Sequence, residues 1–207
     1  MIVVYDLETT GLLKRGVRDF LQQPGITQIG AVKLDPDAWC DRIPDEGSAD
    51  PHNVCVVDEF NQLVNPELPF GQWEDKAMKI TGITPDTVKA APSFFVAGKL
   101  LADFCVGARV IAGFNNQGFD DDVLWFQLER YGMLRSFPWP PQNIDVMQLA
   151  TEHLGSVGAA GNRLSNVYKK VTGLELEGAH DALNDVRATA RVLRDIGREV
   201  VLRAHGN

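Results

Sequence analysis

Two carboxylates stand close together near the start of the chain, at Asp6 and Glu8. They follow residues 2–5, an apolar run rich in β-branched side chains, which is typical of a buried strand. Side chains on a strand alternate between its faces, so Asp6 and Glu8 project to the same side. Neighbouring negative charges repel each other unless a cation joins them, and Mg²⁺ prefers carboxylate ligands. The stretch therefore predicts a metal site or, more simply, a strand that ends in a polar turn at residues 9–11.

Two further acidic groups stand where other elements are expected to begin. Asp120 ends the run 116–120 (NQGFD), between a predicted strand and a predicted helix. Asp185 follows His180 by five residues at the start of the last predicted helix. A purely structural explanation is open for each of them. Acidic residues such as Asp120 and Asp181 can cap a helix and oppose its dipole, worth about 0.5–2 kcal/mol, and a histidine at a helix start is often a cap or a surface residue.

Together, these side chains have one chemical interpretation. The carboxylates that would converge at one edge of a sheet are Asp6, Glu8, Asp120 and Asp185. Such a group can hold two divalent ions, and two ions about 4 Å apart can activate a water and stabilise the leaving oxygen of a phosphodiester. A neighbouring His180 could take the proton from that water, because imidazole exchanges protons near neutral pH.

The order and spacing of the motifs resemble those of the DEDDh, or DnaQ-like, 3′–5′ exonucleases. The matching stretches are residues 6–12 (DLETTGL), 116–120 (NQGFD) and 180–185 (HDALND), with support from 80–84 (ITGIT) and 144–147 (IDVM). The sequences of these motifs are most similar to those of bacterial exonuclease I and of epsilon-type proofreading exonucleases. The resemblance implies an α/β, ribonuclease H-like fold in a single exonuclease domain over residues 1–207. Its sheet would be mixed and five-stranded, with a three-strand antiparallel meander plus parallel strands, and flanked by helices.

The same resemblance implies roles for individual residues. The ligands of two divalent ions, Mg²⁺ or Mn²⁺, would be Asp6, Glu8, Asp120 and Asp185. The general base would be His180. The residues that seat the terminal nucleotide would be Thr9, Thr10, Gly11 and Leu12, with Leu12 against a base. Two further residues, Asn116 and Phe119, would contact the strand or support Asp120.

The activity implied by the resemblance is metal-dependent 3′–5′ hydrolysis of single-stranded DNA, with release of nucleoside 5′-monophosphates. An exoribonuclease is one alternative. A catalytically silent binding module that docks on a polymerase is another, and a polymerase or repair partner fits the active enzyme as well. The complete set of carboxylates with His180 argues against a silent module, because a protein that only binds has no need of this clustered charge.

The elements that must position these groups can be traced from periodicity. Strand character begins at residue 2 and returns over residues 26–34, 54–64 and 109–113. Helical patterns cover residues 73–80, 92–104, 120–131, 144–154, 164–172 and 181–203, with a turn at 81–85. The segment 35–53 is rich in Asp, Pro and Gly and is predicted to be a long loop. Three strands followed by alternating helices and strands indicate a mixed sheet flanked by helices.

Two groups of cations could meet a phosphate backbone. One group follows directly on Leu12 and consists of Lys14, Arg15 and Arg18, so we expect it near the cleft or on an ordinary surface loop. The other is a stripe on the last helix made of Arg187, Arg191, Arg194 and Arg198. Arg187 lies about 200° around the helix from Asp185, so the stripe is predicted to be a solvated face turned away from the metal site.

Composition limits the remaining classes of protein. The 207 residues suffice for one ordinary domain, and the formal net charge of −8 counts mildly against a nucleic-acid binder, which is usually basic. The sequence lacks the run of about 20 apolar residues that a membrane helix needs and has no signal peptide pattern. Its cysteines, Cys40, Cys55 and Cys105, are far apart, which argues against disulfides and predicts a cytoplasmic location.

Overall fold

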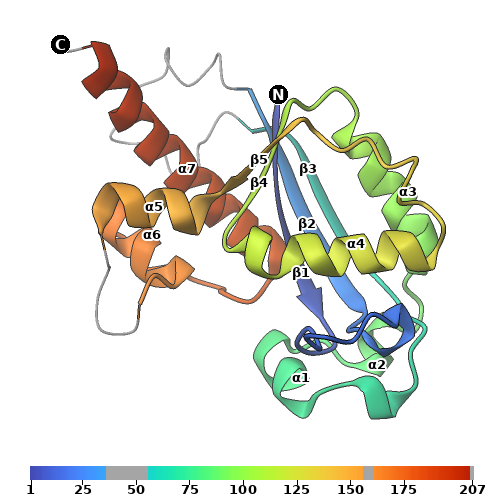
Figure 1. Ribbon diagram of the computed structural model, residues 1–207. Helices are drawn as coiled ribbons and strands as arrows, with labels where there is room; N and C mark the ends of the chain where they lie inside the picture. The colour runs from blue at the N-terminus through green and yellow to red at the C-terminus, as the bar shows by residue number, and fades with distance from the viewer. Residues whose placement is uncertain (36–55, 156–160, 206–207) are drawn as a thin grey trace.

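The computed structural model describes residues 1–35, 56–155 and 161–205, with side chains described as far as residue 197 apart from Phe20 and Phe70. Within these ranges one sheet has the strand order β3-β2-β1-β4-β5 (Figure 1). The strands are β1 (Ile2–Thr9), β2 (Ile26–Leu34), β3 (Val56–Leu63), β4 (Val110–Gly113) and β5 (Gln142–Asp145). The predicted mixed five-stranded sheet is confirmed.

The connections of this sheet bring the acidic motifs together. Strands β1, β2 and β3 form an antiparallel meander, and Glu8 on β1 lies opposite Gln28 on β2. Strand β4 runs parallel to β1, with Val3 opposite Ile111, and β5 runs parallel to β4. Parallel strands end at the same edge of a sheet, so the segment after β4 emerges beside the acidic end of β1. Strands β1 and β2 are mostly buried because helices cover both faces, whereas the edge strand β3 is largely exposed.

Helices form a layer on each face of the sheet (Figure 1). One face carries α3 (Phe94–Cys105) and α4 (Asp120–Arg130), and the other carries α5 (Val146–Leu154), α6 (Leu164–Thr172) and α7 (Ala182–His205). The short helices α1 (Asp75–Thr81) and α2 (Pro85–Val88) lie near the end of β1 (Figure 1). Single 3₁₀ turns span Phe20–Gln22, Phe70–Gln72 and Asn116–Gly118. The apolar side chains of β1 alternate between the two cores, so Tyr5 packs with α3 and α4 while Val4 packs with α7.

Two predicted boundaries are wrong. The helix predicted over residues 144–154 begins at Val146, because residues 142–145 pair with β4 as strand β5. The Asp145 carboxylate then caps the helix by accepting hydrogen bonds from the backbone N–H groups of Met147 and Gln148 at 2.9 and 3.3 Å. The turn predicted over residues 81–85 runs into helix α2, which begins at Pro85. The predicted long loop over residues 35–53 lies, apart from Asp35, outside the described residues.

The arginine stripe of α7 is not the solvated face that its spacing predicts. Arg194 is only 6% exposed and forms an ion pair with Asp195 at 2.7 Å. Arg191 pairs with the same carboxylate, and Arg187 pairs with Glu59 on the edge strand β3. Spacing located the common helix face, but it does not reveal that acidic partners cover that face. The side chain of Arg198 lies outside the described residues.

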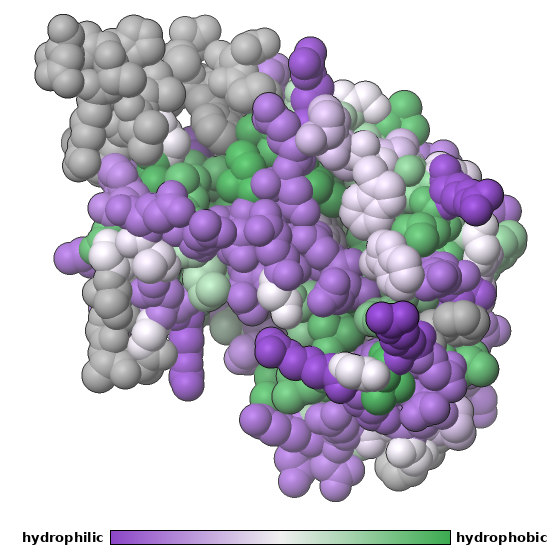
Figure 2. Space-filling view, in the orientation of Figure 1, coloured by the Kyte–Doolittle hydropathy of each residue, from purple (hydrophilic) through white to green (hydrophobic). Residues whose placement is uncertain are grey.

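The surface of the protein carries many of the charged residues that make up 23% of the sequence (Figure 2). In the orientation of Figure 1 the surface is mainly hydrophilic, and hydrophobic residues appear in small groups (Figure 2). Among the described helices, none has the length and apolar character needed to cross a membrane. Cys105 is buried and carries a free thiol.

Candidate active site

Strand β1 places Asp6 and Glu8 at the edge of the sheet, both half-buried. Burial raises the pKa of Asp6 to about 8, with contributions from the nearby charges of Asp185 and Asp181. Burial also raises the pKa of Glu8 to about 9, with contributions from Asp6 and Asp185. The pKa values of both carboxylates are therefore raised partly by neighbouring negative charges, as expected of acidic groups that lie close together.

Helix α4 places Asp120 against this same strand. Asp120 is 6% exposed, and its Oδ1 accepts a hydrogen bond of 3.1 Å from the backbone N–H of Leu7, between the two acidic residues of β1. Burial raises the pKa of Asp120 well above its usual range, and the charge of Asp6 adds to this effect. The Leu7 N–H lowers the pKa but does not offset burial.

The start of helix α7 supplies the remaining groups. The backbone N–H of His180 donates to Asp185 Oδ2 at 3.0 Å, and His180 has a left-handed backbone with φ of 70°. Ligand atoms of Glu8, His180 and Asp185 all lie within 4.8 Å of one another. Burial raises the pKa of Asp185, although the His180 N–H lowers it. Asp181 caps the helix by accepting from the Asn184 N–H at 3.1 Å, so the structural explanation holds for Asp181.

The arrangement suits a divalent cation. All four acidic side chains have raised pKa values because they are buried beside like charges, and a cation would remove that repulsion. In addition, Asp185 Oδ1 is buried and has no hydrogen-bond partner, which leaves a free oxygen ligand. The residues present therefore fit a metal centre. Glu8, His180 and Asp185 form the tightest part of it, and Asp6 and Asp120 complete its charge.

Residues 9–12, which are predicted to seat the terminal nucleotide, have different environments in the structure. The Thr9 hydroxyl donates to the Gly11 carbonyl at 2.8 Å, and the fully buried Thr10 accepts from the Gly25 N–H at 3.1 Å. These two side chains therefore shape the loop. Leu12, by contrast, is 64% exposed and free to contact a ligand.

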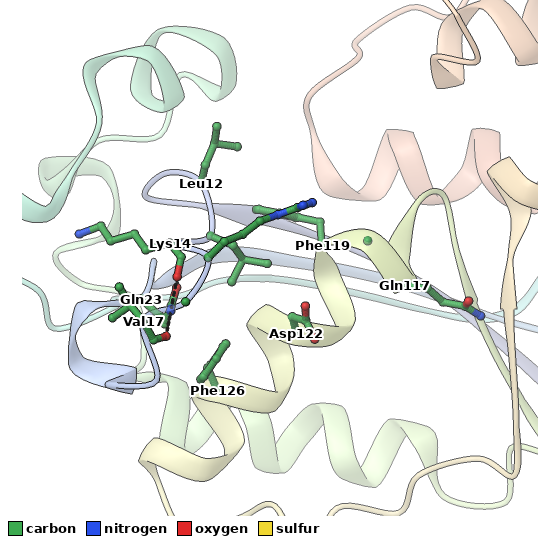
Figure 3. Close-up of a pocket in the computed structure, with 12 residues that line it drawn as sticks. Leu12, Lys14, Val17, Gln23, Gln117, Phe119, Asp122 and Phe126 are labelled. Atoms are coloured by element: carbon green, nitrogen blue, oxygen red, sulfur yellow. Dashed lines mark hydrogen bonds between the residues drawn. The ribbon is translucent and has the colours of Figure 1, made fainter.

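Two hollows meet at Leu12 and Phe119. The smaller, of about 260 Å³, is lined by these residues together with Glu8 and His180, and we call it the acidic pocket. The larger, a cleft of about 540 Å³, lies between the segment 12–17 and helix α4 and includes Phe126 (Figure 3). Because Leu12 and Phe119 line both, they form the wall between the acidic pocket and the larger cleft.

The predicted cations differ in their relation to this cleft. Lys14 and Arg15 are exposed and line it, whereas Arg18 is exposed but is not among its lining residues. The Lys14 amine points away from helix α4 in Figure 3. Asn116 is fully buried, which argues against direct contact with a strand, and it donates to Asp121 and Asn143. These bonds reach the neighbour of Asp120, so the support of Asp120 by Asn116 stays a prediction.

A polar network under α4 was not predicted from the sequence. The Asp121 carboxylate accepts from the Tyr5 hydroxyl, from Asn143 Nδ2 at 2.8 Å and from Asn116 Nδ2 at 3.3 Å. Burial raises the pKa of Tyr5 well above its usual range, and the charges of Asp121 and Asp120 raise it further, so the phenol stays protonated as a donor. The available signals were a tyrosine in an apolar strand and a second acid beside Asp120.

Comparison with known proteins places the chain among exonucleases by sequence. The model of the exonuclease family RNase_T matches residues 3–193. The DNA polymerase III PolC-type of Caldanaerobacter subterraneus subsp. tengcongensis is 30% identical over 192 residues, or 92% of this chain and 11% of that protein. The protein of the same name from Streptococcus thermophilus is 28% identical over 191 residues, again 92% of this chain and 11% of the relative. The chain thus spans about a tenth of these relatives, 11% of their length.

Solved structures share the fold. Escherichia coli exonuclease I in complex with a dA16 oligonucleotide superposes with a TM-score of 0.69 at 23% identity, covering 95% of this chain and 40% of that one. A 3′-exonuclease described as recognising a histone mRNA stem-loop superposes with a TM-score of 0.67 at 20% identity, covering 96% of this chain and 63% of that one. The family match over most of its length shows that this chain belongs to the RNase_T, DnaQ-like exonuclease family, with a ribonuclease H-like fold.

Proposed function

We propose that this exonuclease is a metal-dependent 3′–5′ enzyme that releases nucleoside 5′-monophosphates from single-stranded DNA. The observation that carries the proposal is the acidic pocket of about 260 Å³, where Glu8 and His180 face the same hollow as Leu12 and Phe119. A terminal nucleotide in this pocket would have its phosphodiester beside the clustered ligand atoms of Glu8, His180 and Asp185, which lie within 4.8 Å of one another.

The side chains divide the work of hydrolysis in this proposal. Two divalent ions, Mg²⁺ or Mn²⁺, would be held by Asp6, Glu8, Asp120 and Asp185 and would supply activation of water and charge stabilisation at the leaving oxygen. His180 is exposed at the pocket and would take the proton from the attacking water and pass it to solvent. Leu12 and Phe119 would hold the terminal nucleotide by apolar and stacking contacts.

The adjacent cleft of about 540 Å³ supports a single-stranded substrate. A strand whose last nucleotide occupies the acidic pocket can continue past Leu12 and Phe119 into this cleft, where Phe126 offers another aromatic side chain (Figure 3). Sequence-tolerant binding of single strands combines stacking surfaces of this kind with nearby cations, here Lys14 and Arg15.

The proteins similar to this chain bear on the choice between DNA and RNA. A solved structure with this fold holds a dA16 oligonucleotide, while another is described as recognising an mRNA stem-loop. RNA therefore stays the second candidate substrate. The matched relatives are DNA polymerases of PolC type, which favours DNA and a polymerase as partner.

Digestion of end-labelled oligonucleotides tests the proposal. The purified chain is dialysed against EDTA, then assayed with Mg²⁺, Mn²⁺ or no metal on DNA and RNA strands of one sequence, labelled at the 5′ or the 3′ end. We expect metal-dependent release of a labelled mononucleotide at once from 3′-labelled DNA, and a ladder of shortening products from 5′-labelled DNA. Immediate mononucleotide release from the 5′ label, or no cleavage with either metal, would contradict it. Faster digestion of RNA would select the exoribonuclease.

A further inference from the structure

Gln28 is a buried amide in strand β2, between Thr27 and Ile29. It is 5% exposed and lies directly opposite Glu8 in the antiparallel register. A buried amide destabilises a protein unless its hydrogen-bonding groups find partners. The partners of Gln28 therefore indicate what this side chain does.

Within the described part of the chain the Gln28 side chain makes three hydrogen bonds, and two of them reach the start of helix α7. Gln28 Nε2 donates to Asp181 Oδ2 at 3.1 Å, and Gln28 Oε1 accepts from the Ala182 N–H at 3.4 Å. The third bond joins Nε2 to Asn61 Oδ1 on the edge strand at 3.0 Å. One neutral amide thus ties the helix start to the strand that pairs with β1.

This contact continues to the active-site groups through short bonds. The Asp181 carbonyl accepts from the Asp185 N–H at 2.9 Å, and Asp185 Oδ2 accepts from the His180 N–H at 3.0 Å. His180 has φ of 70°, a conformation that a non-glycine residue keeps only where its surroundings hold it.

The backbone beside Gln28 leaves no free space for the helix to shift. A Cβ atom built on Gly30, two residues further along β2, would lie 2.4 Å from the Ala182 carbonyl carbon. The first turn of α7 therefore rests directly on the strand. Gln28 fixes its position along the strand, while Gly30 permits the close approach.

We propose that Gln28 is a positioning residue, which holds His180 and Asp185 in register with Glu8 by anchoring the start of α7. The proposal rests on the proposed function for its effect on catalysis. The side-chain hydrogen bonds of Gln28 go to Asp181, Ala182 and Asn61, none of which is a proposed metal ligand, so Gln28 acts through the start of α7. His180 lines the smaller hollow, but neither His180 nor Asp185 lines the larger cleft. The loss of Gln28 therefore alters the chemical step and leaves strand binding in the larger cleft unchanged.

Gln28→Met tests this role, because methionine keeps the volume of the side chain without its hydrogen bonds. We expect kcat to fall by up to about 100-fold, the effect of misplacing reacting groups by about 1 Å, with KM little changed. Asn61→Ala is the matched control, since it removes the one Gln28 bond that does not reach α7. The proposal is overturned if Gln28→Met has the same kcat as Asn61→Ala, or if its KM changes while its kcat stays at the wild-type value.

Amide hydrogen exchange provides a readout independent of cleavage. In Gln28→Met, the N–H groups of His180, Ala182 and Asp185 should exchange faster than in Asn61→Ala, while the helix from Ala188 onward keeps wild-type exchange. Unchanged exchange at the helix start overturns the proposal even where wild type proves inactive. Inactive wild-type protein with the expected exchange pattern would contradict only the proposed function.

A second variant covers the case in which Gln28→Met does not fold. Asp181→Ser keeps a residue that caps helices well but is too short to reach Gln28. The same drop in kcat at constant KM and the same faster exchange are expected. If Asp181→Ser keeps the kcat and the amide exchange of wild type, Gln28 does not position the start of α7.

Discussion

Helices α4 and α7 both bring acidic side chains to the end of strand β1, but they are fastened to the sheet in different ways. At α4 the fastening is charged, because the Asp121 carboxylate collects donors from β1, from the turn before the helix and from β5. At the first turn of α7 a neutral side chain makes the link, because the Gln28 amide bonds to Asp181 and Ala182, and further along the helix Arg187 pairs with Glu59 on β3.

Solvent access follows the same division. Asp120 is 6% exposed, whereas Asp185 is half-buried and His180 is exposed. A ligand can be buried, but a group that accepts a proton at each turnover has to return it to solvent. We therefore expect changes at Asp120 and Asp121 on α4 to affect metal binding and stability together, and changes at His180 to affect mainly the rate.

The largest effect should come from Asp120→Asn, which should abolish cleavage. Asparagine can still accept the Leu7 N–H bond, so the variant removes a charge and keeps this hydrogen bond. Removing one of several repelling charges should leave its melting temperature in EDTA equal to or above that of wild type.

Melting curves with metal complete this test. Wild type should be stabilised by Mg²⁺ or Mn²⁺ by RT ln(1 + [L]/Kd), about 2.7 kcal/mol at 100 times Kd, and Asp120→Asn by much less. Asp103→Asn on the exposed side of α3 removes the same charge elsewhere and should behave as wild type. An equal metal-induced shift in Asp120→Asn and wild type would show that Asp120 is not a ligand.

His180→Ala should come next, with a loss of roughly 10²–10⁴-fold in rate, the usual contribution of a general base. The helix start should persist, because the bond from residue 180 to Asp185 involves the backbone N–H, which alanine keeps. Single-turnover rates at neutral pH measure the loss, with His153→Ala on α5 as control. Near-wild-type turnover would remove His180 from the mechanism.

Tyr5→Phe examines the charged fastening of α4. The phenol donates to a carboxylate, and hydrogen bonds to charged groups contribute about 1.5–3 kcal/mol. At roughly 2–4 °C per kcal/mol for a chain of this size, the melting temperature should drop visibly, with a smaller loss of kcat than in Gln28→Met. If Tyr5→Phe loses activity without losing stability, the contrast between the two helix starts is wrong.

The stability of the metal-free protein should depend on pH in a direction that the site determines. Burial raises the pKa of Asp6 to about 8 and that of Glu8 to about 9, above the values expected in the unfolded chain. The folded state then binds more protons than the unfolded state between about pH 4 and pH 9, so the free energy of unfolding decreases as pH rises through this window.

Melting in EDTA from pH 5 to pH 9 checks this direction. Asp120→Asn, which removes one repelling charge, should show a shallower decrease than wild type. Saturating metal should remove most of the decrease, because the cation compensates the same charges. A melting temperature in EDTA that rises steadily over this range would contradict the raised pKa values.

The acidic motifs and the core elements could be predicted from sequence because their signals are local. The apolar run before Asp6, the periodicity of α3 and α6, and the helix-start acids are all visible in short windows. The position of strand β5 was missed because three of its four residues are polar and all four are exposed or half-buried, and only pairing with β4 makes them a strand.

Contacts between distant segments were outside the reach of sequence patterns. Gln28 and Asp181 are 153 positions apart, and Tyr5 and Asp121 are 116 apart, so neither pair leaves a local signal. The arginine stripe shows the same limit at Arg187, whose partner Glu59 lies 128 positions away, whereas Asp195, which pairs with Arg191 and Arg194, lies on the same helix.

The smallest expected effect concerns the cations beside the larger cleft, which lies against α4 and not against α7. We expect these cations to bind the phosphates of the strand. Replacing Lys14, Arg15 and Arg18 by Gln should weaken single-strand binding. The slope of its salt dependence should become shallower by about 0.7 for each phosphate that these cations no longer neutralise. Since Lys14 and Arg15 line the cleft and Arg18 does not, Arg18→Gln alone should contribute least.

The matched control removes three exposed cations elsewhere, Lys89, Lys99 and Arg135, and so changes the net charge equally. The α7 arginines are unsuitable as controls, because Arg194 is buried in an ion pair and its loss would reduce stability. Binding of a labelled strand in EDTA across a range of salt concentrations gives the slopes without cleavage. Equal slopes for the two triple variants would mean that the cations at residues 14–18 act only through net charge, and the strand would then have to follow another path from the acidic pocket.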